Sequence, residues 1–397
     1  MRLLRLARNN ISFIVPITIA LCLLFSMVSI SASQILLSLS LLCWMTLLLL
    51  KKEKLCFPPF FWPLLAYCIL SLVSSFLSFN PEESLWDCRE LLLYLIVPIV
   101  YLGFHREKEL KIANLALLIS AYLSALYSFF YFFLKASPGE RIAGFMGHYM
   151  TQAGLLLLFS CLAMSMFLFS KDKIRLLWGL AFLLTLGSLV LTLTRSAWMG
   201  IVIAAIVILF LYKPKALIIV PLAVGLFFLV SPKQATKRAL SIFSLKTATN
   251  QQRIEYIKGG IKVIKEYPLF GTGPNMVNVE IKKEKYGLSD ESKKLAVHLH
   301  NNIIQIAAER GIPTILTWLI FMAWVFVSLV KLLQNKDPFL FPLTVAALAA
   351  LLGFLTAGLF EYNFGDSEVT TLFLYLITIP FTLERIQKRQ HPDLEKS

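Results

Sequence analysis

The stretch "AVHLHNNIIQIAAERGI" (296–312) runs directly into "PTILTWLIFMAWVFVSLVKLL" (313–333). The second part is apolar except for Lys331 near its end. A run of about 20 such residues spans the hydrocarbon core of a bilayer as an α-helix. The first part is polar and holds two of the five histidines of the chain. This boundary predicts a membrane helix with histidine side chains at its mouth.

Similar apolar runs recur along all 397 residues. The chain is 58% hydrophobic and only 15% charged, whereas a soluble domain carries about a quarter charged residues. A β-barrel would instead show short alternating segments. We therefore predict an all-α polytopic membrane protein with about twelve transmembrane helices. The predicted spans are 11–31, 34–50, 59–79, 88–104, 112–134, 149–169, 175–194, 197–212, 215–230, 313–333, 338–360 and 368–384.

Lysine and arginine are distributed unequally between alternate loops. If the N-terminus lies inside, twenty basic residues fall in cytoplasmic segments and four in the short outer segments. This bias predicts that both termini are cytoplasmic, and it accounts for the net charge of +15 without nucleic-acid binding. The inner residues are Arg2, Arg5, Arg8, Lys51, Lys52, Lys54, Arg106, Lys108, Lys111, Lys171, Lys173, Arg175, Lys213, Lys215, Lys331, Lys336, Arg385, Lys388, Arg389 and Lys396, and the outer ones are Arg89, Lys135, Arg141 and Arg195.

Residues 231–300 form a long outer loop, which divides the chain into nine predicted spans (1–230), the loop, and three spans with a cytoplasmic tail (301–397). The loop has 13 Lys/Arg and 6 Asp/Glu. This excess suits anionic headgroups or phosphate-bearing substrates, and it equally suits a solvated surface. Within it, "RIEYIKGGIKVIKEYPLFGTGP" (253–274) predicts an amphipathic interfacial helix that Pro268 helps to end. Its apolar stripe is Ile254, Ile257, Ile261 and Ile264.

Charged residues collect at the outer helix ends and are almost absent from the span centres. Ion-coupled carriers usually have such residues near mid-bilayer, so the pattern argues against one. Arginine forks bind phosphate oxygens, and neutral histidine can take a proton. Two arginines and one histidine therefore suffice to displace a diphosphate with a hydroxyl nucleophile. The outer candidates are Arg141, Arg195, Arg253, His300, Glu361 and Asp366.

Each candidate also has a structural interpretation. Arg195 could be a snorkelling anchor, and His300 could cap the helix that begins near Asn301. His298 is two residues from His300 and would point elsewhere on a helix, and the six cysteines show no ligand spacing. We therefore expect no metal site, disulfide or cofactor.

Three motifs resemble those of the O-antigen ligase superfamily. His300-Asn301, nine residues and then Gly311-Ile312-Pro313-Thr314 are similar to its "His-[Asn/Ser/Gln]-x9-Gly-x-x-[Gly/Thr/Tyr]" signature. "TRSAW" (194–198) and an arginine followed by "YPLFGTGP" (Arg253 and 267–274) extend the resemblance. Twelve spans with a large periplasmic loop before the histidine also fit the family.

The resemblance implies an inverting, metal-independent glycosyltransferase of the GT-C type in the bacterial inner membrane, with a periplasmic active site. It would transfer a glycan from undecaprenyl diphosphate, among membrane lipids, to a lipid A–core oligosaccharide. His300 would be the catalytic base, and Arg195 and Arg253 would hold the diphosphate. The remaining substrate-binding candidates are Arg141 and His148, in "GERIAGFMGHYM" (139–150), and Asn301 of the signature.

Other activities fit the same residues. An O-antigen polymerase or a protein O-oligosaccharyltransferase would share the donor and differ in the acceptor hydroxyl. A non-catalytic lipid or polysaccharide transporter would need charged or helix-breaking features inside its spans.

Overall fold

The computed structural model describes residues 2–50, 55–244 and 246–390, with side chains from residue 13 onward. The side chains of the predicted inner residues Arg2, Arg5, Arg8, Lys51, Lys52, Lys54 and Lys396 lie outside this description. The described chain is helical and contains no strand. Its α-helices are α1 (Arg2–Phe25), α2 (Ile30–Leu49), α3 (Phe61–Phe76), α4 (Pro81–Asp87), α5 (Ile96–Gly103), α6 (Glu107–Leu134), α7 (Tyr149–Phe169), α8 (Arg175–Leu191), α9 (Arg195–Tyr212), α10 (Ile219–Val230), α11 (Lys233–Leu240), α12 (Ala248–Glu266), α13 (Val277–Glu280), α14 (Asp290–Leu295), α15 (Asn302–Leu332), α16 (Leu340–Gly358) and α17 (Ser367–Gln390).

Six short 3-10 helices connect parts of the described chain: η1 (Cys88–Leu95), η2 (Gly144–Met146), η3 (Pro214–Ile218), η4 (Ser241–Phe243), η5 (Glu284–Tyr286) and η6 (Asn363–Gly365). Seven helices of the described residues are long and apolar enough to cross a membrane: α2, α6, α7, α9, α15, α16 and α17. Shorter apolar helices cover 13–25, 61–76, 175–191 and 214–230. The polytopic class is thereby supported, and the count of twelve spans stays a prediction.

Two predicted spans differ in form from the structure, and one of them, 215–230, is η3 followed by the twelve-residue α10. Residues 88–104 are not one continuous α-helix but η1 followed by α5, which has only eight residues. The segment begins with the charged pair Arg89 and Glu90, which are both exposed. Charged side chains at the start of an apolar run leave only its second half suited to burial among other helices, and α5 is indeed buried along nearly its whole length.

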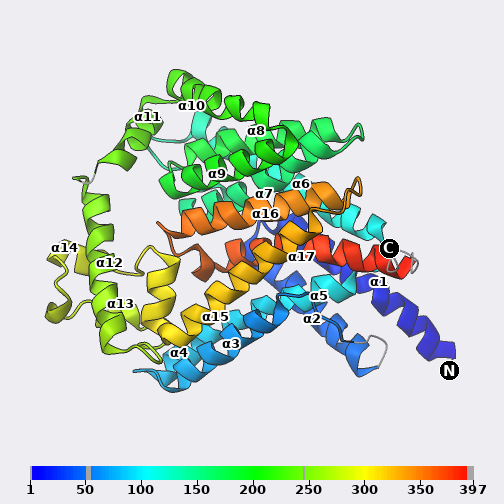
Figure 1. Ribbon diagram of the computed structural model, residues 1–397, viewed down its shortest axis with the longest axis horizontal. Coiled ribbons are helices and arrows are strands. Elements are labelled where there is room, and N and C mark those ends of the chain that lie inside the picture. Colours follow the sequence, from blue (N-terminus) through cyan, green and yellow to red (C-terminus); the bar gives the residue numbers. More distant parts are fainter. Residues whose placement is uncertain (1, 51–54, 245, 391–397) are drawn as a thin grey trace.

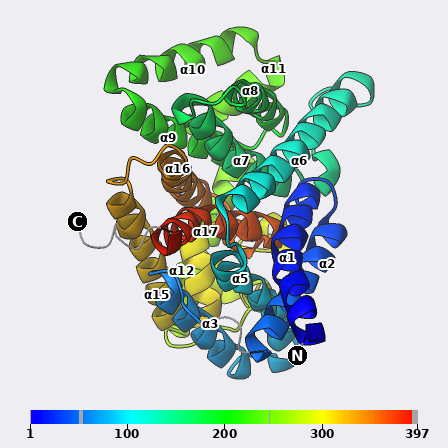
Figure 2. The ribbon, with the colours of Figure 1, turned by 90° about the vertical axis from the view of Figure 1, so that its right-hand side faces the viewer.

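Three helices form the centre of the bundle. Most residues of α7, α16 and α17 are buried, and α16 packs against α7, α9 and α17. Figure 2 shows α17 near the middle, with α1, α2 and α6 on one side and α3 and α15 on another. The start of α1 and the end of α17 lie at one end of the long axis, and α12–α14 lie at the other (Figure 1).

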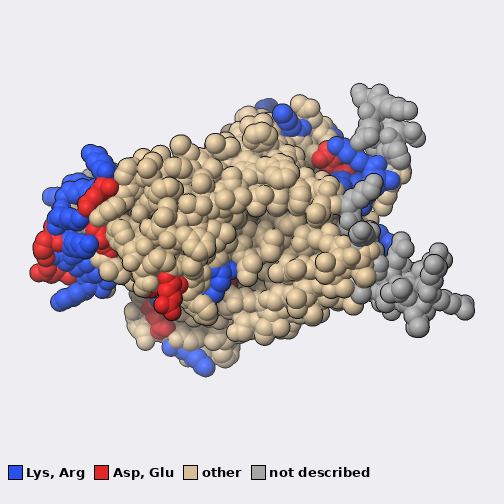
Figure 3. All heavy atoms as spheres, turned by 90° about the horizontal axis from the view of Figure 1, so that it is seen from below, with Lys and Arg blue, Asp and Glu red and all other residues tan. Residues whose placement is uncertain are grey.

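The surface agrees with a membrane setting. In Figure 3, lysine, arginine and acidic side chains gather at the two ends of the long axis, with few between them. Many large apolar side chains of the spans are exposed, such as Ile35, Phe133 and Leu183. Exposed apolar side chains are favourable where lipid replaces water.

The loop predicted at 231–300 folds into α11–α14 with a small core of its own. Tyr256, Val263, Ile281 and Leu299 belong to this buried cluster. The predicted loop helix is confirmed as α12, and Ile264 of the predicted isoleucine stripe packs, half-buried, against both buried clusters. The buried residues of α12, however, are Tyr256, Gly259, Gly260 and Val263, and Ile261 is exposed.

The glycine pair explains this shift of the buried face. A Cβ on Gly260 would lie 2.5 Å from Ile304 Cγ2, and one on Gly259 would lie 2.8 Å from Leu288 Cδ1. Because glycine lacks a Cβ, α12 can approach its neighbours closely along this face. The glycines that cost helix propensity therefore allow the close packing of α12 against α15.

Helix α15 is broken at Gly311, the glycine of the histidine signature. Gly311 has φ 82° and ψ 170°, outside the helical region. The break frees the carbonyls of Ala308 and Glu309, which accept hydrogen bonds from Thr272 N (3.0 Å) and Gly273 N (2.8 Å). The "YPLFGTGP" segment thus supplies a donor to the Ala308 carbonyl, whose helical partner Ile312 N donates to Pro268 instead, and one to the Glu309 carbonyl, whose helical partner Pro313 has no N–H. Two distant motifs of the sequence meet at this break.

Candidate active site

The two histidines of the opening stretch lie in a loop between α14 and α15. His300 has a left-handed φ of 50°, which is unusual for a residue other than glycine. The prediction that His298 points elsewhere is wrong, because it assumed a helix where the chain forms this loop. The ring centroids of His298 and His300 are only 4.2 Å apart. Both rings therefore face one site.

The cap of α15 is Asn301 instead of His300. Asn301 Oδ1 accepts from Ile304 N at 2.9 Å, and its Nδ2 donates to the Leu359 carbonyl at 2.9 Å. The side chain of His300 is therefore free of a capping role. Because both ends of the Asn301 amide are occupied by the protein, its part in substrate binding stays a prediction.

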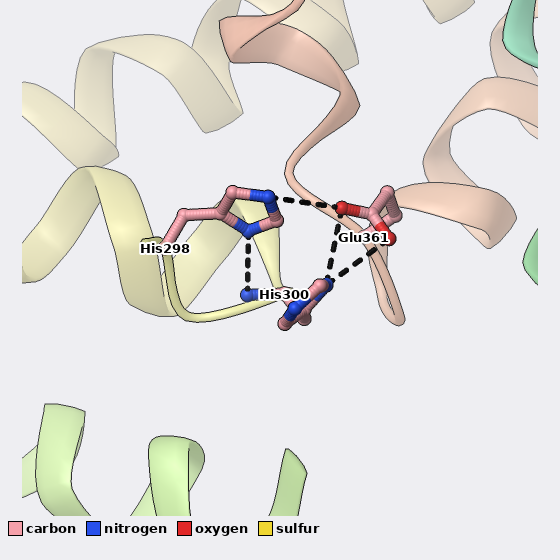
Figure 4. Close-up of side chains that lie close together, drawn as sticks. All are labelled: His298, His300 and Glu361. Atoms are coloured by element: carbon pink, nitrogen blue, oxygen red, sulfur yellow. Dashed lines mark hydrogen bonds and ion pairs between the residues drawn. The ribbon is translucent and has the colours of Figure 1, made fainter. Parts of the chain in front are cut away.

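Glu361, in the segment between α16 and α17, meets both histidines (Figure 4). Its carboxylate oxygens lie 3.1 Å from His300 Nδ1, and Oε1 lies 3.5 Å from His298 Nε2. Arg253 Nη2, from α12, lies 3.7 Å from Oε2. Burial alone would raise the pKa of Glu361, but the hydrogen bond with His300 and the nearby charges outweigh it and lower the pKa to about 2.

The hydrogen bonds determine which nitrogen of His300 is available. An ionised carboxylate only accepts hydrogen bonds, so we assign the His300 proton to Nδ1, facing Glu361. The lone pair of Nε2 is then free to accept a proton. A carboxylate that fixes the tautomer of a histidine in this way is the usual arrangement for a general base.

The same three side chains have the spacing of a possible metal site, with ligand atoms within 4.8 Å of one another. Two features of the donor set argue against a cation. His298 Nδ1 accepts from His300 N at 3.3 Å, so the proton of the neutral ring is on Nε2, the atom that faces Glu361. A metal-binding histidine instead donates from its second nitrogen. Arg253 also adds a positive charge beside the carboxylate.

Four arginines from four separate segments lie beside His298, His300 and Glu361. Arg141, Arg195 and Arg253 were expected here, and Arg238 of α11 was not. Arg238 is close enough to interact electrostatically with each of the other three. It lies in the lysine-rich stretch 233–238, which looks like a solvated basic surface in the sequence, so no local signal distinguishes it.

The turn before α9 organises three of these arginines. Leu193 has a positive φ of 52°, which turns its carbonyl toward the site. Arg141 donates to the Thr192 and Leu193 carbonyls at 3.0 and 3.3 Å, and Arg238 donates to Leu193 at 3.4 Å. Arg141 also lies over the Tyr149 ring, 3.4 Å from its centroid. The turn at Thr192–Leu193, directly before the "TRSAW" motif that begins α9, therefore collects positive charge.

Arg195 is 5% exposed and is hydrogen-bonded to residues of η4 and α12. Its Nη1 donates to the Ser241 carbonyl (3.1 Å) and hydroxyl (3.0 Å), and its Nη2 donates to Asn250 Oδ1 at 2.7 Å. All of these acceptors are uncharged. Among the described residues, Glu361 is the carboxylate paired with this arginine group, through Arg253. The group therefore has an excess of positive charge, which favours a multivalent anion.

His148 lies at the edge of the same region. Its Nδ1 is 3.4 Å from Thr151 Oγ1, and the Thr151 hydroxyl donates to Asp366. Burial, and the charge of Arg141, lower the pKa of His148 against the opposing effect of Glu361. His148 thus stays a candidate for substrate contact, at the edge of the group around Glu361.

A histidine–carboxylate pair beside an arginine group can accept a proton next to a bound anion. Residues 180–319 match the sequence model of the family described as O-Antigen ligase. This segment includes Arg195, Arg253, His300 and Gly311, so the resemblance indicated by the motifs is confirmed over it. No curated protein matches the chain.

Proposed function

We propose that this protein is a glycosyltransferase of the O-antigen ligase type. It transfers a glycan from undecaprenyl diphosphate to a hydroxyl of a lipid A–core oligosaccharide at the periplasmic face of the inner membrane. The GT-C architecture with twelve spans, the inverting stereochemistry and metal independence are parts of the same proposal. The observation that carries it is the His300 Nδ1–Glu361 contact beside four arginines.

In the proposed reaction the acceptor hydroxyl attacks the anomeric carbon of the donor sugar. Its proton moves to His300 Nε2, and the imidazolium that forms is stabilised by Glu361. The bond between the anomeric carbon and the diphosphate oxygen breaks, and its electron pair stays on the diphosphate. A single displacement of this kind inverts the anomeric configuration.

The arginines have a separate role in this proposal. Charge builds up on the leaving diphosphate in the transition state, where preorganised donors stabilise it most. Arg195 and Arg253 bind the diphosphate oxygens, and Arg141 and Arg238 add to the positive field. Because diphosphate leaves as an anion, the departing group needs no acid catalyst.

The test is His300→Ala, assayed in vitro with purified undecaprenyl-diphosphate-linked glycan and lipid A–core. Turnover should fall by roughly 10²–10⁴-fold, at equal abundance of folded protein. His105→Ala, at the opposite end of the bundle before α6, is the control and should stay near the wild-type rate. Near-normal transfer by His300→Ala would remove the proposed base.

The acceptor is tested in cells by the lipopolysaccharide profile of a strain that lacks the gene. Loss of all long chains with an intact core supports the ligase. A core that carries one repeat unit indicates a polymerase instead, and an unchanged profile with altered glycoproteins indicates a protein-directed transferase.

A further inference from the structure

The first turns of α15 carry a buried polar row directly behind the histidine loop. Gln305, Glu309 and Arg310 are 2%, 3% and 6% exposed. Gln305 Oε1 accepts from Leu299 N at 2.6 Å. Leu299 is the residue between His298 and His300, so this bond holds the backbone of the loop at its centre.

We infer that Gln305 is a positioning residue, whose amide holds the histidine loop so that His300 Nδ1 faces Glu361 and Nε2 faces the substrate. The inference rests on His300 acting as the base in the proposed function. The left-handed backbone of His300 is unfavourable by itself and persists only where surrounding contacts determine it. The bond from Leu299 N to Gln305 is such a contact, one residue away.

A second hydrogen bond fixes the orientation of the Gln305 amide. Its Nε2 donates to Glu309 Oε1 at 2.8 Å, and the same oxygen accepts from Asn275 N at 3.0 Å. The backbone N–H of Leu299 can only donate, so the amide oxygen must face Leu299 and the amide nitrogen faces Glu309. The acceptor for the loop is therefore supplied in one defined orientation.

Glu309 and Arg310 form a buried pair that also contacts the segment carrying Glu361. Glu309 Oε2 lies 2.6 Å from Arg310 Nη1, and Nη1 donates to the Tyr362 hydroxyl at 3.2 Å. Arg310 Nη2 lies 3.6 Å from Asp87 of α4. Tyr362 follows Glu361 directly in the chain. The histidine loop is thus connected to the Glu309–Arg310 pair through Gln305. The segment that carries Glu361 is connected to the same pair through Tyr362.

Gln305 is the residue of this row best suited to substitution. Removing one member of the buried Glu309–Arg310 pair leaves an unpaired charge and endangers folding. Gln305 is uncharged, and methionine has a similar length and shape without the amide. Gln334, exposed just beyond the other end of α15, offers the matched control Gln334→Met.

The experiment measures kcat, donor KM and the pH profile of kcat for Gln305→Met, with purified undecaprenyl-diphosphate-linked glycan and lipid A–core. We expect kcat to fall at least about tenfold and the profile to shift, because the histidine no longer keeps its contact with Glu361. Donor KM and the binding of undecaprenyl diphosphate alone should stay within about twofold. Gln334→Met should match the wild type in each measurement.

A purely structural glutamine would lower the yield of folded protein and leave kcat and its pH profile unchanged per folded molecule. That result overturns the inference. If His300→Ala is inactive but Gln305→Met is normal, the inference about Gln305 is overturned and the proposed function stands. If His300→Ala is active, the proposed function is overturned together with the inference.

If Gln305→Met does not fold, hydrogen exchange of the wild-type peptide 296–301 provides the second test. The Leu299 amide should exchange as slowly as the adjacent amides of α15. Exchange at the rate of an open loop overturns the inference.

Discussion

In the proposed mechanism, Glu361 orients His300 through its charge and its acceptor geometry. Glutamine has the same size, but its amide nitrogen would donate to His300 Nδ1 and force the proton onto Nε2. The base would then be blocked in the wrong tautomer. We expect Glu361→Gln to lower kcat by roughly 10²–10⁴-fold, with little change in the amount of folded protein.

The measurement is in vitro glycan transfer, with Glu291→Gln on the exposed surface of α14 as the control. The variant should keep its affinity for undecaprenyl diphosphate, because the arginines remain. A Glu361→Gln enzyme with a rate within a few-fold of the wild type would show that the tautomer of His300 is fixed by another group.

His298 makes the histidine loop sensitive to acid. Burial, against the opposing charge of Glu361, lowers the pKa of His298 from 6.5 to about 4. The unfolded or opened loop therefore binds a proton more readily than the folded loop between these values. The stability that the neutral ring contributes is complete above pH 6.5 and is lost as pH falls toward 4, by at most about 1.4 kcal/mol per pH unit.

Hydrogen exchange of residues 296–301 at pH 7 and pH 5, corrected for intrinsic rates, tests whether the loop becomes less stable as pH falls. Opening of the wild-type loop should increase at pH 5. His298→Asn places an oxygen near the position of Nδ1 and cannot titrate, so its loop should open equally at both pH values. Equal opening of the wild type at the two pH values would contradict the prediction.

Among the elements, the break in α15 depends on one glycine. A Cβ on Gly311 would lie 2.1 Å from the Leu269 carbonyl oxygen, a backbone atom that cannot move aside easily. The positive φ adds about 1–2 kcal/mol for any other residue. We expect Gly311→Ala to lower the free energy of unfolding by more than about 2 kcal/mol.

The readout is thermal unfolding in detergent together with the yield of monodisperse protein. Gly225→Ala in α10 is the matched control, because no atom lies within 4 Å of its Cβ position and its φ is not positive. The control should be neutral or slightly stabilising. Similar behaviour of the two variants would mean that the break does not depend on glycine.

Sequence patterns predicted the elements better than their packing faces. Apolar length identified the long helices α7, α15, α16 and α17, and periodicity identified α12, because both signals are local. The buried face of α12 was missed, since Gly259 and Gly260 contribute no apolar side chain to the pattern. These glycines allow α12 to approach Leu288 and Ile304 closely, and no local sequence pattern reveals such a contact.

The same distinction applies to the site. Motif resemblance identified His300 and Arg253, and charge at the outer helix ends made Glu361 a candidate. Its contact with His300, 61 residues away in the chain, was not predicted. Its role arises from the packing of α15 against α16. Arg238 reaches the site through the fold of α11, and His298 was misjudged because the expected helix is a loop. Residue spacing alone does not determine these contacts.

On the scale of the whole molecule, the fold brings positive charge from α9, α11, α12 and the 141–148 segment to one place. Arg253 lies on α12, beside Glu361, whereas Arg195 is fixed at the start of α9 and bonded to Ser241 and Asn250. Arg195 can therefore act in two ways. It can bind the diphosphate with Arg253, or it can only hold the start of α12 in place.

Three variants separate these roles. A planar fork can bind diphosphate oxygens in a bidentate manner, which lysine cannot do. If Arg195 and Arg253 bind the diphosphate, Arg195→Lys and Arg253→Lys should each lose at least about tenfold in turnover and weaken the binding of undecaprenyl diphosphate. Asn250→Ala removes a bonding partner of Arg195 and keeps its charge, so it should lose much less. If Arg195 only holds α12, Asn250→Ala should cost as much as Arg195→Lys. Lysine variants that both keep more than about half the wild-type rate, a change under about 0.5 kcal/mol in the barrier, would mean that neither arginine binds the leaving group.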